Sequence, residues 1–127
     1  MSTLKTSNIQ DTSGGNNSTP EQINQGRAKA WVNFDGAAAN APVRDSFNVD
    51  SVTDVATGKY TINFTSGFGN TNYCAVMYNN ANSLLGLVNF SNQYTGGMKL
   101  NNSSLEVASY NAGYSDSATF CVVVFGG

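Results

Sequence analysis

The chain has 127 residues, a net charge of −2 and no histidine, and 11% of its residues are charged, where about 25% is usual. Its length suits one domain with a single core, and its six basic residues are scattered, which argues against a nucleic-acid partner. No uninterrupted apolar run of about 18 residues is present to cross a membrane, and without histidine the Ser-His-Asp and Cys-His arrangements are excluded.

Residues 1–26 differ from the rest and are expected to form an N-terminal arm. Residues 13–18 (SGGNNS) indicate a flexible polar linker. Thr19 is then the expected N-cap of a short helix near residues 19–25, with Pro20 as its first residue, Gln22 closing a capping box and Gly26 ending it. Such an arm buries too little to fold alone. Its large apolar residues are too widely spaced for a local cluster, so we expect the arm to dock elsewhere through Leu4, Ile9, Pro20 and Ile23.

From residue 27 to residue 127 the pattern predicts strands. Alternation places Ala30, Val32 and Phe34 on one face, and Tyr60, Ile62 and Phe64 on one face of a hairpin. Seven or eight short strands separated by turn residues are typical of an all-β domain, an antiparallel β-sandwich or jelly roll. The expected strands cover residues 28–34, 43–49, 51–55, 59–64, 73–78, 84–90, 104–110 and 118–125.

Three of these strands carry apolar residues on both faces. In 118–125 and in 84–90 the apolar residues do not alternate with polar ones, and Trp31 falls on the outward face of its strand. An antiparallel sandwich strand normally leaves one face in water, so something must cover the second face. A neighbouring subunit is the favoured cover, and the arm or a long loop is the alternative. The expected subunit interface consists of Trp31, Leu85, Leu87, Val123 and Phe125.

Cys74 and Cys121 lie in apolar runs and are expected to be buried free thiols, although a disulfide is possible if their strands are neighbours. No cofactor or metal motif is present. Calcium bound by Asp50 and Asp54 remains an open alternative. The acids that a glycosidase would need are better interpreted as solvated or turn-capping groups. These acids are Asp45, Asp50, Asp54, Glu106 and Asp116.

The scarcity of charge is offset by many Asn, Ser and Thr residues. A neutral polar surface suits contact with copies of the chain or with sugars, because burying an amide costs less than burying a charge. The alternative explanation for the scarcity of charged residues is a compositional bias of the source. Tyrosines near turns can stack on sugar rings, although each can equally be a half-buried residue with its hydroxyl at the surface. The candidate glycan contacts are Tyr78, Asn79, Asn80, Tyr94, Tyr110 and Tyr114.

Several segments carry a resemblance to a known group of proteins. They are residues 8–15 (NIQDTSGG), 18–23 (STPEQI), 26–36 (GRAKAWVNFDG), 44–49 (RDSFNV), 58–64 (GKYTINF) and 122–126 (VVVFG). With these segments the chain resembles small β-rich modules of tail-fibre and other virion proteins of tailed bacteriophages, especially phages of marine bacteria and cyanobacteria. Residues 77–114 match no pattern of that group, and the turn at residues 55–60 departs from its usual turn sequence.

The resemblance implies a non-enzymatic virion structural protein that forms a homo-oligomer, most often a trimer. Residues 1–5 lack the apolar core of a signal peptide, so we expect the protein to be made in the host cytoplasm. It implies a fibre or knob module whose arm anchors it to other virion proteins and whose β domain contacts the host surface through glycan. Neither nucleic acid nor membrane insertion is expected. Two alternatives remain open: a capsid-decorating or head-fibre protein without a receptor role, and a free lectin-like binding module outside any virus.

Overall fold

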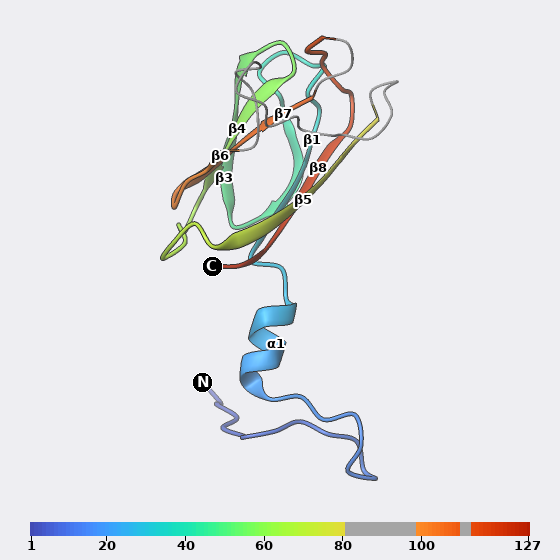
Figure 1. Ribbon diagram of the computed structural model, residues 1–127, viewed down its shortest axis with the longest axis vertical. Helices are drawn as coiled ribbons and strands as arrows, with labels where there is room; N and C mark the ends of the chain where they lie inside the picture. Colours follow the sequence, from blue (N-terminus) through green and yellow to red (C-terminus); the bar gives the residue numbers. More distant parts are fainter. Residues whose placement is uncertain (81–98, 110–112) are drawn as a thin grey trace.

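The computed structural model describes residues 1–80, 99–109 and 113–127, and in these ranges it is a β-sandwich preceded by an arm with one short helix (Figure 1). Every strand pairing is antiparallel. The strands form two four-stranded sheets, in the orders β2-β1-β8-β5 and β3-β4-β7-β6. The prediction of an all-β antiparallel sandwich is confirmed.

The elements follow the predicted order with small shifts in their bounds. The expected strand over residues 84–90 lies outside the described residues, and the two-residue strand β6 was not predicted. The elements are α1 (Pro20–Gly26), β1 (Ala30–Phe34), β2 (Val43–Phe47), β3 (Val49–Ala56), β4 (Lys59–Phe64), β5 (Tyr73–Asn79), β6 (Lys99–Leu100), β7 (Ser104–Ala108) and β8 (Phe120–Gly126).

Asn48 separates β2 from β3, which the sequence did not predict. Its φ of 55° lies in the left-handed region, which Asn tolerates better than most residues. Its side-chain amide donates to the carbonyls of Lys29 and Ser66 and accepts from the Ser66 N–H. Val49 therefore begins β3 instead of ending β2, because the chain leaves β2 at Asn48, two residues before the predicted break at residue 50.

Alternation along the strands fills the space between the sheets. Ala30, Val32 and Phe34 of β1 and Tyr60, Ile62 and Phe64 of β4 all point inward, as predicted. An aromatic cluster joins the two sheets at one end. Phe34 stacks on Phe120 with ring centroids 5.0 Å apart, and the ring of Tyr60 meets both edge-on, at 5.0 Å and 5.5 Å.

The hydroxyl of Tyr60 is bonded as well as its ring. It donates to the Gly36 carbonyl at 2.8 Å and lies 3.0 Å from Asp116 Oδ1, which also accepts the Gly58 N–H. Burial, followed by the nearby Asp116 carboxylate, raises the pKa of Tyr60. The hydroxyl thus stays protonated and ties the turn between β3 and β4 to the loops after β1 and before β8.

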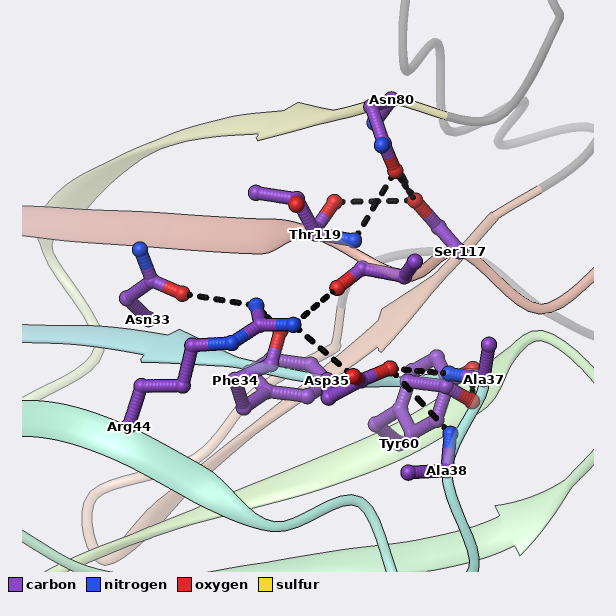
Figure 2. Close-up of polar contacts among 12 residues, drawn as sticks. Asn33, Phe34, Asp35, Ala37, Ala38, Arg44, Tyr60, Asn80, Ser117 and Thr119 are labelled. Atoms are coloured by element: carbon purple, nitrogen blue, oxygen red, sulfur yellow. Dashed lines mark hydrogen bonds and ion pairs between the residues drawn. The ribbon is translucent and has the colours of Figure 1, made fainter.

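Arg44 closes the same end of the sandwich from the outside (Figure 2). Its Nη2 donates to Asp35 Oδ2 at 2.8 Å and to the Ala118 carbonyl at 2.6 Å, while Nη1 contacts Asn33 Oδ1 and the Phe34 carbonyl. Oδ1 of Asp35 accepts the N–H groups of Ala37 and Ala38, which shapes the loop that follows β1. One guanidinium therefore joins three separate chain segments, using the fork geometry specific to Arg.

The two ends of the sandwich differ. The loops after β1 and β3 and the segment before β8 gather at one end, whereas the arm and α1 extend from the opposite end, where β1 begins and β8 finishes (Figure 1). We call these the loop end and the arm end.

Gly36 leaves no room for a side chain. A Cβ at this position would lie 2.5 Å from the Tyr60 oxygen and 2.7 Å from its Cζ. We predict that Gly36→Ala lowers the free energy of unfolding by about 1–3 kcal/mol, the scale of overpacking, measured by chemical denaturation. The matched control is Gly69→Ala, where an added Cβ meets nothing within 4 Å. Equal stability of the two variants would contradict this account of the Tyr60 contact.

Candidate functional site

The outer face of the β2-β1-β8-β5 sheet carries an apolar row that crosses all four strands. Register pairs Phe47 with Trp31, Trp31 with Val123 and Val123 with Val76. Phe47 and Val76 are 54% and 59% exposed, and Trp31 and Val123 are half-buried. Adjacent positions continue this surface with Phe125 opposite Cys74 and Tyr78 opposite Cys121. We call Phe47, Trp31, Val123 and Val76 the apolar row.

The outer face of the other sheet has a polar counterpart. Register pairs Thr53 with Thr61 and Thr61 with Glu106. Next to them, the Asn63 amide donates to Ser51 and Thr53 hydroxyls at 3.1 Å. We call these residues the polar row. In an antiparallel sheet with one face in water, the side chains on that face are normally polar, as they are here. The apolar row is therefore specific to one side of the sandwich.

The structure brings together three of the five residues expected at a subunit interface. Trp31, Val123 and Phe125 share the outer face of one sheet, while Leu85 and Leu87 lie outside the described residues. The arm does not cover this face, because it leaves from the arm end and every arm residue except the half-buried Ser18 is exposed (Figure 1). Sequence reasoning missed Phe47 and Val76, although alternation within their strands was a usable signal.

The expectation of two buried thiols is wrong. Cys74 is exposed and Cys121 is half-buried, and neither forms a disulfide. Both alternate with inward-facing neighbours, Cys74 with Tyr73 and Cys121 with Phe120 and Val122, so both fall on the outer face. The outward position of the two cysteines was not evident from the sequence, because both strands carry apolar residues on both faces.

The arm contains a hydrogen-bonded turn where the sequence predicted a flexible linker. Ile9 and Ser18 exchange backbone hydrogen bonds at 2.9 and 2.8 Å, and Asp11 organises the turn between them. Its Oδ1 accepts the Ser13 N–H, the Ser13 hydroxyl and the Gly15 N–H, while Oδ2 accepts the Asn16 amide. These bonds, above all from the Ser13 side chain, hold the pKa of Asp11 below its usual value.

The arm's apolar residues line one hollow but remain exposed to solvent. Leu4, Ile9, Pro20 and Ile23 line one hollow of about 550 Å³, because the turn at Asp11 folds residues 1–10 back toward α1. Leu4 and Ile9 remain 83% and 51% exposed. Thr19 caps α1 and Gln22 closes the capping box, as predicted. A hydrogen-bonding Asp followed by Ser, Gly and Asn was a signal for this turn.

The candidate glycan contacts near the loop end have different environments. Tyr78 is 60% exposed on the outer face, whereas Asn79 is 6% exposed and donates to the Ser109 hydroxyl. Asn80 is exposed, but its Oδ1 accepts from Ser117 Oγ and the Thr119 N–H (Figure 2). Lys59 Nζ lies 4.1 Å from the ring centre of Tyr114. Tyr94 and Tyr110 lie outside the described residues.

Asp116 is a structural acceptor for Gly58 and Tyr60. Within the described ranges, no three His, Cys, Asp or Glu residues gather where they could hold a metal ion. In the same ranges, no helix has the length and hydropathy needed to span a bilayer.

No protein-family model, curated protein or solved structure matches this chain.

We predict that the arm turn opens in acid. The folded pKa of Asp11 lies below the ordinary value of 3.8, so the carboxylate stabilises the turn above the unfolded pKa, and this support is lost as the pH falls through the folded pKa. An NMR titration of the Ser13 and Gly15 amide resonances should give a midpoint below 3.8. Asp11→Asn should abolish that titration. A midpoint at or above 3.8 would contradict the assigned hydrogen bonds.

Proposed function

We propose that this chain is a non-enzymatic structural protein of a tailed-phage particle, a fibre or knob module anchored by its arm. The main support is the position of the arm, which extends from one end of the sandwich with Leu4, Ile9 and Ile23 exposed. Exposed apolar residues on a projecting segment are typical of a docking element. The core contains no arm residue, so the arm is available for a partner without loss of the sandwich.

The apolar row supports self-association. A second copy that covers Trp31 and Val123 would remove apolar surface from water, and the polar row on the opposite side offers no such gain. A cyclic trimer with its axis along the strands would leave all three arms at the same end. A knob that is attached to a particle at one point needs all of its anchoring segments at the same end, and this arrangement provides that.

Contact with the host is proposed at the loop end, away from the arm. Tyr78 presents an exposed ring there, and Asn80, two residues further along the chain, is exposed as well. Neutral groups of this kind bind sugar hydroxyls at a low desolvation cost. Glycan on the host surface is the proposed ligand.

Two variants test the proposal by separating anchoring from association. Deletion of residues 1–26 should leave a folded oligomer that no longer joins particles, because the core lies entirely within the sandwich. Val123→Lys should keep the fold and the arm but give a monomer, because it places a charge in the apolar row. Light scattering gives the oligomeric state, and mass spectrometry of purified particles gives the incorporated amount.

Thr61→Lys is the matched control, since Thr61 holds the corresponding central position in the polar row. It should keep the wild-type oligomeric state. Particles that still incorporate the truncated chain would overturn the anchoring role. A Val123→Lys protein with unchanged oligomeric state would overturn the interface.

A further inference from the structure

Two neighbouring hollows at the arm end share one residue, Arg27. The first is the arm hollow described above, which Lys5 and Arg27 also line. The second has a volume of about 490 Å³ and lies where β1, the turn at Asn48 and the loop after β4 meet; Arg27, Lys29, Phe47 and Phe68 line it. We call it the basal hollow. Arg27 borders both hollows, and Lys29 of the basal hollow donates to Asn24 of the arm hollow, so the two hollows adjoin. We call the pair of hollows the track.

The charge of this track is opposite to that of the whole chain. Lys5, Arg27 and Lys29 line it, three of the six basic residues in a protein of net charge −2. No Asp or Glu is among the lining residues of either hollow in the described part of the chain. The nearby Asp11 carboxylate is already occupied by four donors of its own turn.

Apolar side chains line both hollows together with the three cations. Leu4, Ile9 and Ile23 share the arm hollow with Lys5 and Arg27, and Phe47 and Phe68 share the basal hollow with Arg27 and Lys29. Lys29 Nζ donates to Asn24 Oδ1 at 2.6 Å, which positions the ammonium while leaving two of its three donors for a ligand. A ligand that fills both hollows therefore needs negative charges together with bulky apolar groups.

We propose that the track binds an extended acidic segment, bearing bulky apolar side chains, of the protein that anchors the arm; this rests on the proposed anchoring function. Alternating carboxylates and apolar side chains would match the lining, whereas a nucleic acid presents a continuous row of phosphates and favours an unbroken basic stripe. The acidic remainder of the chain repels such a segment, so charge directs it to the arm end.

The test uses the full-length chain and a short synthetic peptide in which Asp alternates with Leu. NMR titration should shift the resonances of Ile23, Arg27, Lys29 and Phe68, and binding should weaken as salt is added. Arg27→Gln should weaken binding roughly threefold to fivefold, the scale of one partly exposed ion pair. Thr57→Glu, which changes the net charge by the same amount at an exposed loop-end position, should leave the affinity unchanged.

Three outcomes would overturn the docking track: equal binding of a peptide with Lys in place of Asp, equal loss of affinity in the two variants, or tighter binding of single-stranded DNA than of the acidic peptide. A further experiment distinguishes failure of the docking track from failure of the anchoring role. If a chain with Arg27→Gln and Lys29→Gln enters particles as the wild type does, while the chain lacking residues 1–26 does not, the arm anchors but the track is wrong.

Discussion

The structure depends on the contact that Tyr60 makes between the two sheets. Its ring packs edge-on against Phe34 and Phe120 of the opposite sheet, and its hydroxyl bonds to Gly36 and Asp116 in the loops beyond them. A sandwich of short strands has few places where one side chain can fix both the spacing of its sheets and the position of its loops. Arg44 adds a second tie on the outside, to Asp35 and the Ala118 carbonyl. Together these contacts tie the loop after β1 to the segment before β8.

Because these contacts lie between the sheets and in the loops, the two outer faces of the sandwich remain available for binding. One outer face carries the apolar row and the other carries the polar row, and the proposed association uses the face with the apolar row. The arm end carries cations and apolar residues, and the loop end carries Tyr78, Asn80 and the Arg44–Asp35 ion pair. We infer a division of work along the molecule, with anchoring at one end, association at the side and ligand contact at the other end.

Much of the fold was predictable because its signals are local. The capping box at Thr19 and the inward alternation of β1 and β4 need only neighbouring residues for their recognition. The contacts that fix the loop end were not predictable, since Arg44 and Ala118, or Tyr60 and Asp116, are far apart in sequence. The arm hollow was missed for a different reason: spacing alone suggested that Leu4 and Ile23 stay apart, whereas the turn at Asp11 brings them together. The exposed position of Cys74 follows from alternation, but only once its strand is known to have an apolar outer face.

The most direct test of the central claim is cryo-electron microscopy of the purified tailed-phage particle proposed to carry this chain. The account predicts threefold density at the tail, with the arm end directed toward the particle and the loop end directed outward. Density on the head lattice with the loop end buried, or particles that contain no copy of the chain, would contradict it.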